Sequence, residues 1–173
     1  MADAPVRITR RAPLDIAQVA SFGDPAETAE RLSKHFALTI TPAPNCAVAA
    51  GDLTILWHGP GQWLIVRISK TAPLTDELAA LRGETAAVVD LGHARTALRF
   101  EGDGARDVLA RGTSIDLRPA RFSPGACALT ALGKIGALLH AVGPETIDVY
   151  APRSYGQALA EWLGHAGREV TIE

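Results

Sequence analysis

The chain has 173 residues, of which 47% are hydrophobic and 21% are charged, and its formal net charge is -2. This length is sufficient to bury a hydrophobic core without metal ions or disulfides, and the composition is that of a globular domain. The small negative net charge provides no excess of basic residues for nucleic acid or anionic membranes, so both classes of partner are disfavoured.

The cysteine content and the N-terminal sequence bear on where the protein works. Cys46 and Cys127 are far apart and lack the CxxC spacing of zinc or redox sites. The N-terminal sequence carries charges throughout and lacks the apolar stretch of a signal peptide, and no segment is long enough to cross a membrane. We therefore expect a cytoplasmic protein without disulfides.

Residues 1–24 combine prolines, basic residues and isolated apolar residues, a pattern typical of an arm that lies over a surface. We expect this arm to become ordered when the protein binds a partner. Residues 25–173 are expected to form a single domain.

The first predicted helix begins after Asp24, because Asp24 suits the N-cap position and Pro25 the first helical position. The helix should end near Ala37. Its apolar stripe is formed by Ala29, Leu32 and Phe36. The next segment contains Pro42 and Pro44, so it is expected to be a loop or an extended segment rather than a central strand.

A hairpin, a helix and a strand are predicted next. Residues 53–58 and 62–69 are rich in β-branched and aromatic residues and flank Gly-Pro-Gly, which predicts a hairpin. Residues 71–83 predict a short helix that ends at a glycine. Strands are expected over residues 84–93 and 95–102. The apolar face of the helix is formed by Leu74, Leu78 and Leu81.

The same order of elements returns near the C-terminus. Strands are predicted over 126–133, 134–143 and 146–152, followed by a helix over 154–167 and a final strand over 168–173. The apolar positions of this helix are Tyr155, Leu159, Trp162 and Leu163. We interpret residues 51–91 and 134–173 as two copies of one hairpin, helix and strand unit. The predicted fold class is therefore α+β, with duplicated ferredoxin-like (split βαβ) units and mostly antiparallel sheets.

Two short motifs near the middle of the chain invite a functional reading. His93 and Arg95 alternate along a predicted strand, so they either hold a carboxylate together or form a polar edge or subunit contact. Gly102-Asp103-Gly104 precedes a helix and resembles a phosphate-holding turn, but Asp103 would repel a phosphate. Capping of the helix by Asp103 is the favoured role.

The loop that follows this helix contains further candidates. Ser114, Asp116 and Arg118 recur at every second residue, as on one face of an extended segment. Either a polar ligand or a buried salt bridge that fixes the loop fits this pattern. Cys127 lies in an apolar strand and is expected to be a small buried side chain. The histidines lie in separate elements without the spacing of metal ligands, so no metal site is expected in this chain.

Three stretches together carry a resemblance to a known family. GPGQWLIV at 59–66, the region 88–140 and IDVYAPRSYGQALAEWL at 147–163 resemble the gamma subunit of heterotetrameric sarcosine oxidase. The similarity covers roughly two thirds of the chain, in the same order and with similar spacing. That family resembles the folate-binding domain of aminomethyltransferases, which is likewise built from duplicated ferredoxin-like units.

The resemblance implies a noncatalytic subunit of an enzyme that oxidatively demethylates sarcosine to glycine, produces hydrogen peroxide and passes the one-carbon unit to tetrahydrofolate. The implied partners are the alpha, beta and delta subunits. FAD, FMN, NAD and tetrahydrofolate are then expected in the larger subunits and zinc in the smallest, with no cofactor and no catalytic residue in this chain. The positions that match the family pattern, expected to serve packing or intersubunit contacts, are His93, Arg95, Ser114, Asp116, Pro124 and Cys127.

Two alternatives remain open. The chain is also compatible with the equivalent subunit of a related N-methyl amino acid dehydrogenase, such as N-methylglutamate dehydrogenase. A stand-alone folate-binding protein is the other alternative, and it requires a carboxylate from Asp90, Asp116 or Asp148 to hold the pterin ring. In each case the hydrophobic fraction predicts an exposed apolar patch and possible self-association of the isolated chain.

Overall fold

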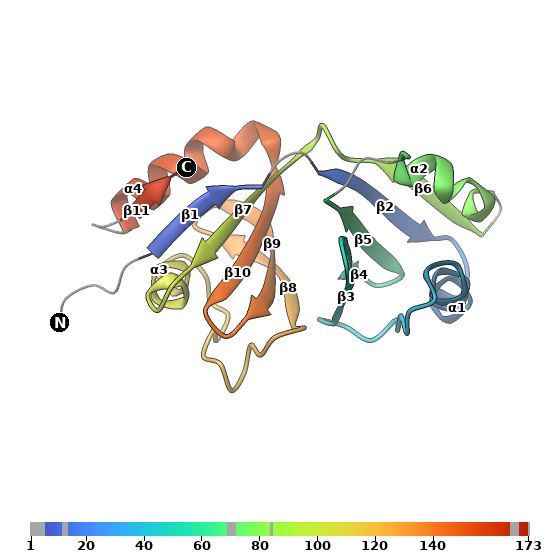
Figure 1. Cartoon of the computed structure of the whole chain (residues 1–173), viewed down its shortest axis with the longest axis horizontal. Helices are drawn as coiled ribbons and strands as arrows, with labels where there is room; N and C mark the ends of the chain where they lie inside the picture. The colour runs from blue at the N-terminus through green and yellow to red at the C-terminus, as the bar shows by residue number, and fades with distance from the viewer. Residues whose placement is uncertain (1–5, 12–13, 69–71, 84, 167–169, 173) are drawn as a thin grey trace. The chain divides into compact units, whose positions relative to one another are not determined.

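A computed structural model describes residues 6–11, 14–68, 72–83, 85–166 and 170–172. The chain divides into two compact units (Figure 1). We call residues 12–93 the middle unit, and residues 1–11 together with 94–173 the terminal unit. A single domain with an internal duplication was expected over residues 25–173, and this stays a prediction. The strand that follows His93 belongs to a different sheet from the strand that precedes it.

The middle unit is a ferredoxin-like sheet with one added strand. Its elements are β2 (Asp15–Ser21), α1 (Pro25–Phe36), β3 (Ala47–Ala50), β4 (Leu53–Gly59), β5 (Gln62–Arg67), α2 (Leu74–Glu77), the 3-10 turn η1 (Ala79–Leu81) and β6 (Ala86–Asp90). The strand order is β3-β4-β5-β2-β6, and all neighbours are antiparallel. The order of β4, β5, β2 and β6 is that of a split βαβ unit, with β3 added at the edge.

The terminal unit repeats this plan with an extra strand from the N-terminus. Its elements are β1 (Val6–Arg10), β7 (Arg95–Glu101), α3 (Ala105–Ala110), β8 (Cys127–Leu132), β9 (Ile135–Gly143), β10 (Thr146–Pro152), the 3-10 turn η2 (Arg153–Tyr155), α4 (Gly156–Ala166) and β11 (Val170–Ile172). The strand order is β11-β1-β7-β10-β9-β8. β1 pairs antiparallel with β7 and parallel with β11, and the other neighbours are antiparallel.

The predicted α+β class with duplicated ferredoxin-like units is confirmed. The hairpin, helix and strand of residues 51–91 correspond to β4, β5, α2 and β6, and those of residues 134–173 to β9, β10, α4 and β11. Each copy also extends upstream by a strand, a helix and an edge strand, namely β2, α1 and β3 in one copy and β7, α3 and β8 in the other.

The predicted arm over residues 1–24 is wrong for the residues that the structure describes. β1 lies inside the six-stranded sheet, and its Val6 and Ile8 are buried. β2 lies between β5 and β6, and its Ile16 and Val19 are buried. Both strands are stabilised by pairing with segments distant in sequence, which the local mixture of prolines and arginines does not indicate.

The helix termini test the capping predictions. The carboxylate of Asp24 accepts a hydrogen bond from the Ala26 amide at 2.8 Å, and Ala37 ends the helix in the left-handed region with φ 52. Both predictions for α1 are therefore confirmed. The capping role expected for Asp103 is wrong, because Gly104 is the N-cap of α3 and no side chain caps this helix.

One face of the terminal unit's sheet packs against α3 and α4. Phe100, Ile147 and Val149 of this face form a core with Leu109 of α3 and Leu159 of α4. Tyr155, expected on the apolar face of the last helix, is instead half exposed in η2. The expected Leu163 side chain lies outside the described residues. Among the helices that the structure describes, none is long and apolar enough to cross a membrane.

Candidate functional site

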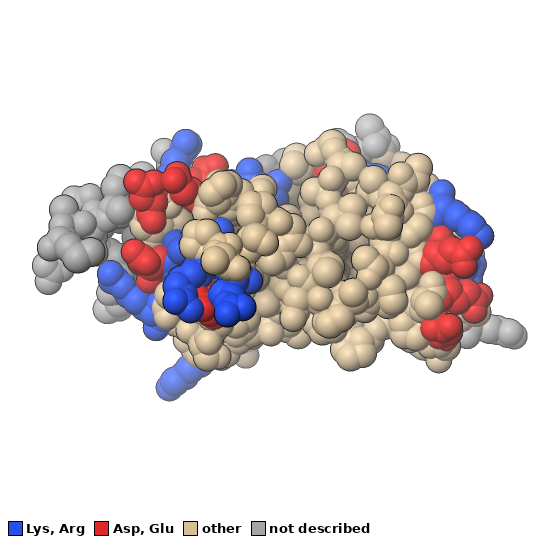
Figure 2. Space-filling view, turned by 90° about the horizontal axis from the view of Figure 1, so that it is seen from below, with Lys and Arg blue, Asp and Glu red and all other residues tan. Residues whose placement is uncertain are grey.

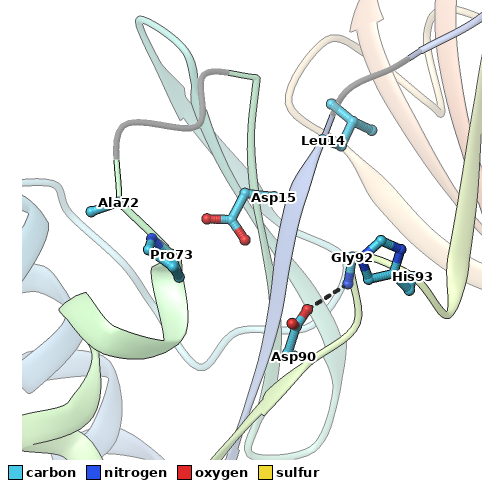
Figure 3. A pocket seen from close by; sticks show the side chains of 7 residues that line it. All are labelled: Leu14, Asp15, Ala72, Pro73, Asp90, Gly92 and His93. Atoms are coloured by element: carbon cyan, nitrogen blue, oxygen red, sulfur yellow. Dashed lines mark hydrogen bonds between the residues drawn. The ribbon is translucent and has the colours of Figure 1, made fainter.

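A small pocket of mixed polar and apolar lining lies beside the start of β2 and the end of β6 (Figure 3). Its volume is about 230 Å³, and it is lined by Leu14, Asp15, Ala72, Pro73, Asp90, Gly92 and His93. Asp15 Oδ2 accepts a hydrogen bond from the Leu74 amide at 2.7 Å, which fixes the first turn of α2 against β2. Asp90 Oδ1 accepts one from the Gly92 amide at 2.8 Å, which closes the turn after β6. Both carboxylates therefore hold backbone amides in place.

The prediction that His93 and Arg95 share one face of a strand is wrong. His93 is exposed in the turn that follows β6, whereas Arg95 is the first residue of β7. The turn forms because the side chain of Asp90 accepts the Gly92 amide and the Leu91 amide donates to Ile16 O at 2.8 Å. Burial lowers the pKa of Arg95, which is half-buried.

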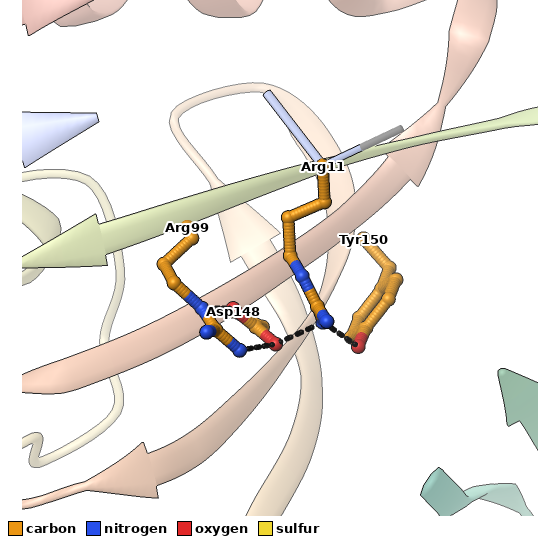
Figure 4. Close-up of polar contacts among 4 residues, drawn as sticks. All are labelled: Arg11, Arg99, Asp148 and Tyr150. Atoms are coloured by element: carbon orange, nitrogen blue, oxygen red, sulfur yellow. Dashed lines mark hydrogen bonds and ion pairs between the residues drawn. The ribbon is translucent and has the colours of Figure 1, made fainter. Parts of the chain in front are cut away.

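A buried ion-pair cluster, which the sequence patterns did not reveal, lies on the other face of the terminal unit's sheet (Figure 4). Asp148 of β10 is 1% exposed. Arg99 of β7 binds it in a bidentate manner, with Nε 2.8 Å from Oδ1 and Nη2 3.0 Å from Oδ2. Arg11, just after β1, donates Nη1 to Oδ2 at 2.6 Å and to the Tyr150 hydroxyl at 3.5 Å. One carboxylate therefore joins three strands.

His140 of β9 stands opposite Asp148 in the register of the sheet, and it is also buried. Burial lowers the pKa of His140 to about 4, although the nearby Asp148 carboxylate opposes the shift. Its Nδ1 is buried and has no hydrogen-bond partner among the residues that the structure describes. Burial also raises the pKa of Tyr150. At neutral pH the His140 and Tyr150 side chains are consequently neutral.

Strand register explains how distant residues come together in this cluster. Arg99, Asp148 and His140 occupy one row across β7, β10 and β9. Cys127 continues the row on β8, where it is fully buried as predicted. The sequence contains one signal of this cluster. Each of the apolar strands TALRF and TIDVYAP includes a charged residue, and a charge buried in such a strand requires a partner of opposite charge.

The loop candidates do not lie on one face of an extended segment, so that prediction is wrong. Asp116 and Arg118 turn toward each other: the carboxylate accepts the Arg118 amide at 3.1 Å and its Nε at 2.8 Å. The alternative of a buried salt bridge is also wrong, because the Arg118 side chain is 79% exposed. Ser114 and Pro124 are exposed on the same loop.

A pterin-binding carboxylate was considered at Asp90, Asp116 or Asp148. Asp148 is fully engaged by Arg11 and Arg99. Asp116 is paired with Arg118. Asp90 lines a pocket, but it is already bonded to a backbone amide and the pocket is small.

Comparison with known proteins decides the family. A sequence profile described as the sarcosine oxidase, gamma subunit family matches residues 22–169. The chain belongs to this family. The sarcosine oxidase subunit gamma of Corynebacterium sp. (strain U-96) is 31% identical over 125 residues, which are 70% of this chain and 61% of that protein. That of Arthrobacter sp. is 30% identical over 117 residues, which are 68% of this chain and 58% of that protein. The matched region thus spans about three fifths of the length of these curated relatives.

Solved structures support the fold of the family. A chain of heterotetrameric sarcosine oxidase from Corynebacterium sp. U-96, in complex with pyrrole 2-carboxylate, aligns with a TM-score of 0.84 and 24% identity, covering 96% of this chain and 85% of that one. Aminomethyltransferase T of the glycine cleavage system from Bartonella henselae aligns with a TM-score of 0.73 and 14% identity, covering 98% of this chain and 48% of that one. The predicted likeness to aminomethyltransferase folds is confirmed.

Proposed function

We propose that this chain is the gamma subunit of a heterotetrameric sarcosine oxidase and that it is noncatalytic. The proposed complex oxidatively demethylates sarcosine to glycine, transfers the one-carbon unit to tetrahydrofolate and produces hydrogen peroxide. The observation that carries the proposal is the family match over residues 22–169. The structural alignment over 96% of the chain agrees with it.

The functional groups of the described residues support a noncatalytic role. In the pocket of Figure 3, the carboxylates of Asp15 and Asp90 hold backbone amides. In the cluster of Figure 4, the carboxylate of Asp148 holds two arginines. A general acid or base has to reach a substrate proton. These three carboxylates instead serve the architecture of the strands and turns that carry them.

We propose that FAD, FMN, NAD and tetrahydrofolate are held by the larger subunits and zinc by the smallest. The pocket of about 230 Å³ is smaller than the roughly 300–1,000 Å³ of typical ligand sites. A second groove, of about 470 Å³, has four carboxylates in its lining against two arginines, Arg106 and Arg118; the carboxylates are those of Asp103, Asp107, Asp116 and Glu145. Arg106 is bonded to backbone carbonyls and Arg118 is paired with Asp116, so the excess of carboxylates would repel the phosphates of flavin and nicotinamide cofactors and the carboxylates of folate. Within the described residues, no group of three or more His, Cys, Asp or Glu side chains is placed to hold a metal ion.

The proposed partners are the alpha, beta and delta subunits. Of the residues that match the family pattern, His93, Ser114, Asp116 and Pro124 are exposed, and we propose that they contact those subunits. Cys127 is fully buried and serves packing. A cytoplasmic location remains a prediction of the sequence.

Self-association of the isolated chain also remains a prediction. Leu129 on the edge strand β8 is 51% exposed and Val142 of β9 is 39% exposed. Sedimentation velocity over a range of concentrations should detect dimers of the isolated chain that the double variant Leu129→Ser, Val142→Ser no longer forms. Concentration-independent monomers of the parent chain would contradict the prediction.

Purification of the tagged chain from its native cell tests the proposed function. Recovery of a yellow complex with larger flavoprotein subunits that consumes sarcosine is the expected result. A yellow complex that oxidises N-methylglutamate instead would assign the chain to the related dehydrogenase. A colourless single chain that binds tetrahydrofolate would overturn the proposal and favour a folate-binding protein, with Asp90 as the residue to substitute first.

A further inference from the structure

The loop over residues 111–126 joins α3 to β8 without forming a helix or strand of its own. We call it the arginine loop. Loops longer than about 12–15 residues without secondary structure are uncommon in compact domains, and they are usually functional or disordered. The hydrogen bonds and burial of this loop distinguish between these two cases.

The buried guanidinium of Arg106 ties the arginine loop to the sheet. Arg106 is 9% exposed, and its Nη1 donates to Leu117 O at 2.5 Å and to Phe122 O at 2.9 Å. Its Nε donates to Pro144 O at 2.6 Å, in the turn between β9 and β10. Leu117 and Phe122 are themselves buried apolar anchors. The loop is therefore fixed at two points by one side chain of α3.

Further contacts hold both ends of the loop. Thr113 and Thr130 share a hydrogen bond of 2.9 Å between their hydroxyls, which joins the start of the loop to β8. The Gly125 amide donates to Ala141 O at 2.9 Å, at the end of the loop. With the Arg106 contacts, these bonds make the loop an ordered platform rather than a slack connection.

Hydrogen bonds within the arginine loop fix the turn that carries Arg118 and Arg121. The amides of Arg121 and Phe122 donate to Arg118 O at 2.8 and 2.9 Å, which forms a single helical turn. Asp116 binds Nε and Nη2 of Arg118, and hydrogen bonds from Arg118 lower the pKa of Asp116 to about 2. Among the described residues, the hydrogen bonds of the Arg118 side chain use only Nε and Nη2, and the side chain is 79% exposed, so Nη1 can donate to a second carboxylate. An exposed ion pair adds little stability, so its main effect is to orient Arg118.

The loop is a basic segment of a chain whose net charge is negative. Three arginines (Arg111, Arg118 and Arg121) and one aspartate (Asp116) give residues 111–126 a net charge of +2, whereas the whole chain has -2. Figure 2 shows basic side chains gathered around an acidic one on the face where the loop lies in Figure 1. Arg118 and Arg121 are both exposed.

We propose that the arginine loop docks an acidic surface of a partner subunit, with Arg118 and Arg121 as the residues that pair with its carboxylates. This inference rests on the proposed function, because it names the surface that the gamma subunit uses. Arginine is suited to interfaces because its planar fork binds carboxylates with two parallel hydrogen bonds. Pre-ordering of the loop lowers the entropic cost of binding.

The charges beside the loop favour a protein over nucleic acid as the occupant. The 470 Å³ groove along the loop carries Asp103 and Asp107 from α3 and Glu145 from the β9–β10 turn. A polyanion requires a continuous basic surface, which these carboxylates interrupt. A protein surface with mixed charges can place its carboxylates against the arginines and a basic side chain against the groove.

Charge reversal in the arginine loop tests the proposal. The chain and the larger subunits are expressed and purified separately, and the chain is prepared as wild type, as Arg118→Glu with Arg121→Glu, and as the neutral pair Arg118→Gln with Arg121→Gln. A matched control, Arg82→Glu with Lys134→Glu, changes the net charge equally at exposed sites outside the loop. Association with the separated larger subunits is measured by surface plasmon resonance at about 50 mM and about 500 mM salt, because salt screens exposed charges. Thermal unfolding of each isolated chain reports folding.

The loop reversal should slow association about tenfold or more at low salt, and the difference should shrink at high salt. The glutamine pair should show a smaller defect and the control pair none. Equal association rates for wild type and the loop reversal at low salt would overturn the proposal while leaving the subunit assignment intact. If the wild-type chain itself binds none of the larger subunits, the proposed function fails, and the docking proposal fails with it.

Discussion

Replacing Asp148 with Asn tests whether the buried ion-pair cluster holds the terminal unit together. The substitution keeps the shape of the side chain but removes the charge that receives three hydrogen bonds from Arg11 and Arg99. Removal of one partner from a buried ion pair costs about 3–5 kcal/mol, because the remaining charge is left buried. The side chains of Arg11 and Arg99 are 13% and 28% exposed, so water can partly solvate them and the lower end, about 3 kcal/mol, is expected.

Urea denaturation followed by circular dichroism measures this loss. With a slope of about 2 kcal/mol per molar urea, a loss of about 3 kcal/mol lowers the midpoint by about 1.5 M. Asp116→Asn is the matched control, because Asp116 also accepts several hydrogen bonds from an arginine but lies on the surface. The control should unfold at the wild-type midpoint. Equal midpoints for Asp148→Asn and wild type would refute the reasoning, as would an equal loss in both variants.

Three further substitutions test the packing and electrostatics of the terminal unit. Gly112→Ala should destabilise the protein by about 1–3 kcal/mol in the same urea assay, since the added Cβ would overlap Cζ2 of Trp162; an unchanged midpoint would contradict this packing. Arg106→Met should increase hydrogen exchange of the amides in residues 117–122, and unchanged protection would show that the guanidinium does not fix the loop. His140 has a pKa of about 4 when folded, below its unfolded value near 6.5, so the unfolded state binds its proton first. The free energy of unfolding should therefore rise from pH 4 to pH 6.5, and His140→Leu should flatten this rise; an identical pH profile for the variant would rule out His140 as its source.

The elements predicted correctly were those whose signal is local. Asp24 and Pro25 mark the start of α1 through a capping bond that involves neighbouring residues only. The turn between β4 and β5 follows from glycine, with Gly61 at φ 64. The leucines at 74, 78 and 81 are buried as expected, although their segment is one helical turn followed by a 3-10 turn. The repeated order of hairpin, helix and strand was visible because each of these signals occurs twice.

The features that were missed depend on contacts between distant segments. β1 is a strand because β7 and β11 pair with it on either side, and neither pairing is encoded in residues 6–10 themselves. Asp148 meets Arg11 across 137 positions of the sequence. His93 and Arg95 alternate in the sequence as residues on one face of a strand do. The bond from the Gly92 amide to the Asp90 side chain instead forms a turn, which contains His93 and precedes β7. Prediction of such features requires the sheet register, which a single sequence does not supply.

Assembly is the central claim, and reconstitution measures it most directly. The alpha, beta and delta subunits are expressed with and without this chain, and the purified material is analysed by size-exclusion chromatography and by sarcosine-dependent oxygen consumption. The account predicts that the chain elutes with the flavin-containing subunits at one equivalent and that activity requires the assembled complex rather than this chain alone. Elution of the chain apart from those subunits, with the same activity in its absence, would contradict the account.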